Sequence, residues 1–335
     1  MTPLSPLRLA WVGCHIEGGL AFEALMQAGA PIVGAITLTP ERRARRSGAT
    51  DYGPACARWD VPLHQITDIN GADGLAVLRA LAPDIAFVIG WSQIVRPPAL
   101  RLARIGMVGA HASLLPRHRG SAPVNWALIN GETETGNSLI WLTEGVDEGA
   151  VIDQASFPIT PYETVASLYQ QVAQSNRDML LRLLPRLLAG ERPGRLQPAS
   201  DEPVLPRRRP ADGVIDWNRP SRQVYDFIRA LTRPYPGAFS WLDGRRWTVW
   251  QAALVPPAHG LARAAPAGTV LGPVVSPIAH ACGQMVACGG EVGEAGAVVL
   301  LELEAEDGTI LAGRDLSNRS WTGKVWTEAR EYALA

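Results

Sequence analysis

The sequence predicts an α/β fold: a parallel sheet covered by helices on both faces, followed by a small β-barrel. Three observations lead to this prediction. Short apolar runs closed by glycine alternate with helical segments over the first half of the chain, which is typical of strand–helix–strand units. After residue 238 the pattern changes to short strands joined by turns. At 335 residues the chain also exceeds the usual size of a single core, so two domains are expected.

Apolar periodicity places the elements of the first domain. Leu7 to Gly13 is a short apolar run that predicts the first strand, and the helix after it is expected to stop at Gly29. Asp73 stands where it can cap a later helix. The expected strands are 7–13, 31–37, 61–64, 84–90, 106–110 and 138–142, and the expected helices are 20–28, 52–59, 74–81 and 164–188.

A proline- and arginine-rich stretch, 191–210, is expected to be a linker between the two domains. Residues 216–233 contain a helical pattern. Asp243-Gly244 separates two alternating runs and predicts a hairpin turn. Further strands are expected at 268–271, 285–288 and 297–303. The predicted organisation is therefore a domain over 1–190, a linker over 191–210 and a second domain over 211–330.

Composition limits the classes of function. The net charge of −1 gives no electrostatic reason to expect nucleic acid as a partner. No apolar stretch reaches the roughly 18 residues of a membrane-spanning helix, and the N-terminal stretch is interpreted as a strand, not a signal peptide. The four cysteines have no zinc-ligand spacing, so we expect buried free thiols in a reducing cytoplasm and no metal.

Two titratable residues follow predicted strands. His111 ends the small-residue run Gly109-Ala-His111, and Asp147 lies in the glycine-bounded loop Gly145-Val-Asp-Glu-Gly149. Loops at the carboxyl ends of parallel strands share one edge of the sheet, so both side chains are expected at the ligand-binding edge. An imidazole and a carboxylate can form an acid/base site. A buried structural histidine and a surface turn are the alternatives that the residues alone leave open.

The segment 106–154 resembles the folate-dependent formyltransferases, which comprise methionyl-tRNA formyltransferase and the sugar N-formyltransferases. The matching residues are Gly109-Ala-His111-Ala-Ser-Leu-Leu-Pro116-Arg-His-Arg119-Gly120-Ser-Ala-Pro123, the run Asn125 to Gly136 and the loop that ends at Asp147-Glu-Gly149. Arg233-Pro-Tyr-Pro-Gly-Ala-Phe239 resembles the C-terminal domain of the family. The similarity covers nearly the whole chain and is closest to the formyltransferase domain that acts on UDP-4-amino-4-deoxy-L-arabinose. It implies a Rossmann-like N-terminal domain and an OB-like C-terminal β-barrel.

The resemblance also implies roles for single residues. His111 would handle the proton of the attacking amine or of the folate leaving group, and Asp147 would orient and charge-stabilise that imidazole. Ser113 and Arg119 would support their loop. Two segments match positions that line the pterin pocket of the family: Gln93, Ile94 and Val95 in the first, and Thr143, Glu144, Gly145, Val146 and Asp147 in the second.

Gly109 is the main departure, because the family has asparagine here, placed to donate to the oxygen of the tetrahedral intermediate. Losing one such donor costs roughly 10²- to 10³-fold in rate. Three interpretations stay open. Another donor serves, such as a backbone N–H, a water or His111 itself; the chemistry has drifted to another transfer or to hydrolysis; or the protein binds folate or a nucleotide without turnover. Asn125 is no obvious replacement, because the family motif already contains it.

The implied activity is transfer of a formyl group from N10-formyltetrahydrofolate, a co-substrate, to a primary amine of a small molecule. A nucleotide-linked amino sugar is the favoured acceptor. A methionyl-tRNA acceptor is the alternative, but only the run Glu41 to Arg46 is strongly basic, and a solvated surface explains it more simply. No membrane association is expected, and a homodimer is left open.

Overall fold

The computed structural model describes residues 7–255, 265–289 and 296–328. They form two compact units that interleave along the chain. The first unit contains the described residues up to Val124, together with Glu134–Pro158 and Ser167–Arg207. The second contains Asn125–Thr133, Ile159–Ala166 and the described residues from Arg208 onward. Each unit is described by itself.

A seven-stranded sheet forms the centre of the first unit, with the order β3-β2-β1-β4-β5-β6-β7. The strands from β3 to β5 are parallel, whereas β6 and β7 pair antiparallel at one side. The predicted Rossmann-like sheet is therefore confirmed, with an antiparallel hairpin added to it. The strands are β1 (Leu9–Val12), β2 (Ile32–Leu38), β3 (Leu63–Ile66), β4 (Ile85–Val88), β5 (Gly106–His111), β6 (Glu134–Trp141) and β7 (Val151–Pro158).

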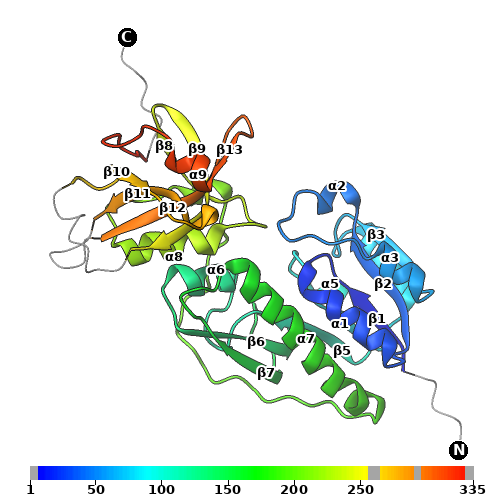
Figure 1. Ribbon diagram of the computed structural model, residues 1–335. Helices are drawn as coiled ribbons and strands as arrows, with labels where there is room; N and C mark the ends of the chain where they lie inside the picture. Colours follow the sequence, from blue (N-terminus) through cyan, green and yellow to red (C-terminus); the bar gives the residue numbers. More distant parts are fainter. Residues whose placement is uncertain (1–6, 256–264, 290–295, 329–335) are drawn as a thin grey trace, which may run out of the picture. The chain divides into compact units, whose positions relative to one another are not determined.

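Helices cover both faces of this sheet (Figure 1). They are α1 (Ile16–Gln27), α2 (Pro40–Arg43), α3 (Gly53–Arg58), α4 (Ala72–Leu81), α5 (Pro97–Leu100) and α7 (Val165–Leu188), while α6 (Pro123–Ile129) passes into the second unit. Asp73 lies in the first turn of α4, whose N-cap is Gly71, and its carboxylate accepts hydrogen bonds from Thr67 and Gly74. It therefore ties the preceding loop to the helix but is not the N-cap.

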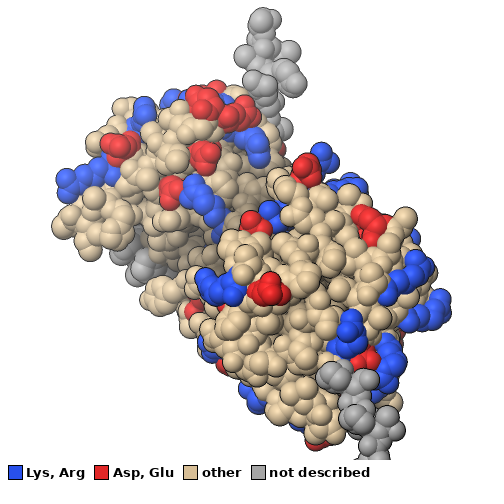
Figure 2. Space-filling view, turned by 90° about the vertical axis from the view of Figure 1, so that its right-hand side faces the viewer, with Lys and Arg blue, Asp and Glu red and all other residues tan. Residues whose placement is uncertain are grey.

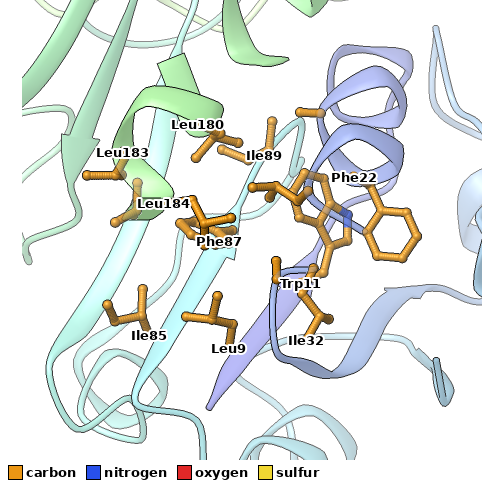
Figure 3. Close-up of a cluster of buried hydrophobic side chains, with 14 of the residues drawn as sticks. Leu9, Trp11, Phe22, Ile32, Ile85, Phe87, Ile89, Leu180, Leu183 and Leu184 are labelled. Atoms are coloured by element: carbon orange, nitrogen blue, oxygen red, sulfur yellow. The ribbon is translucent and has the colours of Figure 1, made fainter. Parts of the chain in front are cut away.

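The larger core lies on the face covered by α1 and α7. Figure 3 shows Leu180, Leu183 and Leu184 of α7 near Phe87, and Phe22 of α1 beside Trp11 of β1. Phe87 is fully buried, and such a side chain contributes about 1.5–3 kcal/mol to folding through burial alone. On the opposite face, Ala86 and Val88 of β4 pack in a second cluster with Leu78 of α4. Because both faces are apolar, β4 is a continuous apolar run in the sequence.

The second unit contains an antiparallel sheet with the order β10-β11-β12-β9-β8, and β13 pairs with β12. This agrees with the predicted C-terminal β domain. Asp243 and Gly244, with φ of 52° and 69°, form the predicted hairpin turn. The elements are α8 (Ser221–Leu231), β8 (Ala238–Leu242), β9 (Arg245–Leu254), β10 (Val270–Val274), β11 (Gly283–Cys288), β12 (Gly296–Ala305), β13 (Ile310–Ala312) and α9 (Gly313–Ser317).

Parts of the predicted organisation lie outside the described residues: 1–6 of the first domain, and 256–264, 290–295 and 329–330 of the second. Within the part of the chain that the structure describes, no helix combines the length and apolar character needed to cross a bilayer.

The four cysteines, Cys14, Cys56, Cys282 and Cys288, are free and buried. Burial raises the pKa of Cys56 to about 11 and the pKa of Cys288 to about 12. The thiolate is the reactive species, so little of the thiolate of Cys56 or Cys288 is present at pH 8.

We expect iodoacetamide to label the native protein at pH 8 only slowly and the guanidinium-unfolded protein rapidly at all four sites, as measured by mass spectrometry. Rapid labelling of Cys56 or Cys288 in the native protein would contradict this burial.

Candidate active site

His111 is the last residue of β5, and its imidazole has an acceptor oxygen near each ring nitrogen. Nδ1 lies 3.4 Å from Oδ2 of Asp147, and Nε2 donates to the backbone carbonyl of His118 at 2.7 Å. The His111 side chain is 8% exposed and that of Asp147 is 21% exposed. The structure thus brings the two sequence-predicted titratable residues together, within the first unit.

Asp147 reaches His111 by a different route from the one that the sequence suggested. β6 runs antiparallel to β5, with Ser138 opposite His111 and Trp141 opposite Val108. The carboxyl end of β6 therefore lies away from His111, and the loop after it must return to bring the carboxylate back. The two side chains lie side by side as expected, but the assumption that both loops follow parallel strands is wrong, because β6 is antiparallel.

The backbone of the returning loop is tightly constrained. Asp147 adopts a left-handed conformation with φ of 55°, and its Oδ2 accepts a hydrogen bond from the N–H of Gly120 at 2.9 Å. At Gly149 a Cβ would lie 1.6 Å from the carbonyl oxygen of Trp141, so only glycine fits. These constraints fix the direction of the carboxylate towards the imidazole.

The arrangement supports proton transfer. Both neighbours of the ring, the carboxylate of Asp147 and the carbonyl of His118, are acceptors. A doubly protonated ring carries an N–H towards each of them, whereas a neutral ring carries only one N–H. The site therefore holds a ring that can accept a proton at one nitrogen and return it while the other nitrogen stays beside its acceptor.

A segment from Arg195 to Leu205, here named the strap, lies along the loops of the site. It belongs to the stretch that the sequence predicts to be a linker, and it falls in the first unit. The amide Nε2 of Gln197 donates to the carbonyl oxygens of Asp147 (2.7 Å) and Gly149 (2.8 Å). The carboxylate of Glu202 accepts from the N–H of His118 at 3.3 Å. Leu205 forms a parallel bridge with Gly120.

The proline-containing loop after His111 is anchored by Ser138, which lies opposite His111 in the sheet. Its hydroxyl donates to the carbonyl of Ser113 at 2.6 Å and accepts from the N–H of Leu115 and from Nε2 of Gln154. Ser113 itself donates to the carbonyl of Arg117. The guanidinium of Arg119 donates to the strap carbonyls of Ser200 and Glu202 and pairs with Glu148. These contacts have the geometry of loop supports.

Gly109 lies in the middle of β5, and the space next to it is filled. A Cβ at this position would lie 2.5 Å from Cδ2 of Leu142, which is closer than side chains approach. Leu142 also packs against the buried clusters on that face of the sheet. An asparagine at position 109 would therefore require Leu142 to move.

The first predicted pterin-pocket segment is fixed by the loop after β3. Gln93 donates to the carbonyl of Thr67 and accepts from the N–H of Ile69, both at 2.9 Å. Val95 is buried in the apolar cluster against which Leu142 packs, while the side chain of Ile94 is 66% exposed.

The second predicted segment runs along the returning loop. Thr143 donates to the carbonyl of Gly145, Glu144 lies 3.9 Å from the guanidinium of Arg101, and Val146 is 36% exposed. Leu142 precedes this segment and packs with Val95 in one apolar cluster, so apolar contacts connect the two segments.

Two further observations concern Asn125 and metal ligands. The side-chain amide of Asn125 donates to the carbonyl of Ala230 at 2.7 Å within the second unit, so this donor is already used. Among the residues described, no group of three or more histidine, cysteine, aspartate or glutamate side chains is arranged to hold a metal ion.

The sequence did not reveal several residues of this site. Gln197 and Glu202 lie in a proline- and arginine-rich stretch, and both act on backbone atoms, which carry no sequence signal. The carbonyl of His118 is likewise invisible in a sequence. Ser138 is fully buried but follows the residues Glu134 to Asn137 of β6, so its burial leaves no clear signal in the sequence.

Comparison with known proteins gives two matching family models. The model described as "Formyl transferase" matches residues 39–184, and the model described as "Formyl transferase, C-terminal domain" matches residues 208–320. A methionyl-tRNA formyltransferase from Symbiobacterium thermophilum is 35% identical over 253 residues, which cover 75% of this chain and 77% of that protein.

Solved structures share the fold at low sequence identity. An N-formyltransferase from Helicobacter canadensis, in complex with folinic acid and dTDP-3-aminofucose, has a TM-score of 0.63 at 15% identity and covers 88% of this chain and 99% of its own. HypX from Aquifex aeolicus, in complex with tetrahydrofolic acid, has a TM-score of 0.62 at 16% identity. That match covers 92% of this chain but only 46% of HypX, so the chain spans about half of its length. Two family models match, and the relative from Symbiobacterium thermophilum is 35% identical over three quarters of the chain. This chain therefore belongs to the formyl transferase family.

Proposed function

We propose that this protein transfers a formyl group from N10-formyltetrahydrofolate to a primary amine of a small molecule, namely a nucleotide-linked amino sugar. The observation that carries the proposal is the contact of His111 with Asp147 at 3.4 Å, beside a buried and well-supported loop. Fold neighbours support the substrate class: the Helicobacter canadensis structure contains folinic acid and dTDP-3-aminofucose, and a sugar 3N-formyl transferase, WlaRD, was crystallised with dTDP and 5-N-formyl-tetrahydrofolate.

The chemistry would proceed by addition and elimination. The amine attacks the formyl carbon, the carbonyl becomes a tetrahedral oxyanion, and the bond from this carbon to the folate nitrogen then breaks. The amine loses one proton and the leaving nitrogen gains one, so a single group that accepts and then returns a proton balances the step. His111 is proposed for this role, with Asp147 holding the ring in orientation.

The co-substrate is proposed to lie along the two segments named from the sequence, Gln93 to Val95 and Thr143 to Asp147. Ile94 and Val146 expose aliphatic side chains, as a planar heterocycle requires from its pocket. Gln93, whose amide is fixed by the loop after β3, would hold the first segment in place.

The oxyanion would be stabilised without a side chain at position 109. Leu142 fills the space beside Gly109, so the donor is proposed to be His111. After Nε2 has accepted the proton of the amine, this N–H would bond the oxyanion and then pass the proton to the leaving nitrogen, which requires Nε2 to leave the carbonyl of His118 that lies 2.7 Å away. Formyl transfer is thus favoured over a drifted chemistry or a purely binding role.

A methionyl-tRNA acceptor is the second candidate, favoured by the relative from Symbiobacterium thermophilum. On the face in Figure 2, basic and acidic side chains are interspersed and no broad basic field is visible, which favours the small acceptor.

The free buried thiols fit the reducing cytoplasm, which we propose as the compartment.

The direct test is to incubate the protein with N10-formyltetrahydrofolate and a panel of acceptors, and to follow release of tetrahydrofolate by absorbance. The panel contains nucleotide-linked amino sugars, simple amines and methionyl-tRNA. We expect release only with an amino sugar. Release without any amine would indicate a hydrolase, and tight folate binding without release under any condition would overturn the proposal.

Removing either member of the proton-transfer pair should abolish turnover. We expect His111→Ala and Asp147→Asn each to lower kcat by about 10²- to 10⁴-fold, the range for general acid–base groups. Binding of tetrahydrofolate to His111→Ala, measured by calorimetry, should change little, because His111 lies outside the two proposed co-substrate segments. A residue whose variant keeps most of the wild-type kcat is not part of the mechanism.

The filled space at Gly109 gives a paired prediction. Gly109→Asn alone should lower the free energy of unfolding by roughly 1–3 kcal/mol, because it overpacks against Leu142. The double variant with Gly109→Asn and Leu142→Ala should relieve the clash. Its kcat should exceed that of Leu142→Ala alone, by up to the roughly 10²-fold that one oxyanion donor contributes. Urea unfolding and steady-state rates measure both effects, and equal stability of Gly109→Asn and wild type would show that Leu142 does not occupy this space.

A further inference from the structure

We infer that Gln197 is a positioning residue of the proton-transfer pair, acting through Asp147. This inference rests on the proposed function. Gln197 lies on the strap and touches none of the reacting groups. Its side chain instead forms hydrogen bonds with the backbone of the loop that carries Asp147.

The side-chain amide of Gln197 uses both of its hydrogens on the returning loop. Nε2 donates to the carbonyl oxygens of Asp147 at 2.7 Å and of Gly149 at 2.8 Å. Both partners are acceptors, so the nitrogen and not the oxygen of the amide must face them. A single planar group therefore holds two carbonyls, two residues apart, in one direction.

This hold matters because the backbone of Asp147 is in an unfavourable conformation. A φ of 55° in a residue other than glycine costs of order 1–3 kcal/mol and persists only where neighbours enforce it. The N–H of Gly120 holds the carboxylate itself, and Gln197 holds the main chain behind it. Without the amide, the loop can relax away from this conformation, and Oδ2 then loses its fixed place beside His111.

The opposite side of the imidazole is held less firmly by the same strap. Glu202 accepts from the N–H of His118 at 3.3 Å, and the carbonyl of His118 accepts from His111. Glu202 is exposed, and its bond is longer than either bond of Gln197. Of these two strap side chains, Gln197 therefore makes the shorter hydrogen bonds to the backbone that supports the pair.

The test replaces the donor and keeps the length of the side chain. Gln197→Met removes both hydrogen bonds, and Gln174→Met makes the same change on the exposed face of α7 as a matched control. We expect Gln197→Met to lower kcat about 10- to 10²-fold, as a small misplacement of catalytic groups does, with the KM for N10-formyltetrahydrofolate within about twofold of wild type. The control should match wild type in both.

A double-mutant cycle with Asp147→Asn separates positioning from a general structural role. If Gln197 acts through Asp147, adding Gln197→Met to Asp147→Asn should change kcat by less than about twofold. An equal loss in both backgrounds, or a wild-type kcat in Gln197→Met, would overturn the inference.

A readout without turnover keeps the inference testable if the proposed function fails. In ¹⁵N-labelled protein, the ring nitrogen shifts of His111, assigned with His111→Ala, should change in Gln197→Met and stay constant in Gln174→Met. Unchanged shifts in a folded Gln197→Met protein would overturn the positioning role. If wild type transfers no formyl group to any acceptor while these shifts do change, the proposed function fails and the positioning role stands.

Discussion

Burial of β4 between two apolar layers is the constraint on which the site depends. Phe87 faces the cluster under α1 and α7, while Ala86 and Val88 face the cluster under α4, so the strand can neither slip nor turn over without exposing one of these surfaces. β5 pairs with β4 in register, with Gly109 beside Val88. The position of His111 at the end of β5 therefore follows from packing that contains no catalytic group.

The elements that the sequence predicted well are those with a strong burial signal. The inner parallel strands are buried on both faces and appear as continuous apolar runs, and the long helix α7 has a clear apolar stripe. The strand β7 was not predicted, because it lies at the edge of the sheet and most of its residues are partly buried or exposed. The short helix α6 was missed for a similar reason: seven residues give little more than one period of a helical pattern.

The candidate site was predictable where it depends on side chains in motifs and not where it depends on backbone geometry. His111 and Asp147 were identified from their loops and from the family resemblance, and the structure brings them within 3.4 Å. The path of the chain between them was not predicted, because the direction of β6 depends on its pairing partners in the sheet, which the sequence does not state. Contacts of Gln197 and Glu202 with main-chain atoms leave no pattern of residue types to detect.

The interleaving of the two units has a consequence for any attempt to divide this chain. Asn125 and the residues around Thr160 belong to the second unit, where they contact Ala230 and Arg229, although they lie within the sequence of the first. A cut after Arg207 would leave both segments without these partners and expose surface that is buried in the whole chain. The units therefore have no common breakpoint, and an exchange of modules between relatives must move three stretches of sequence together.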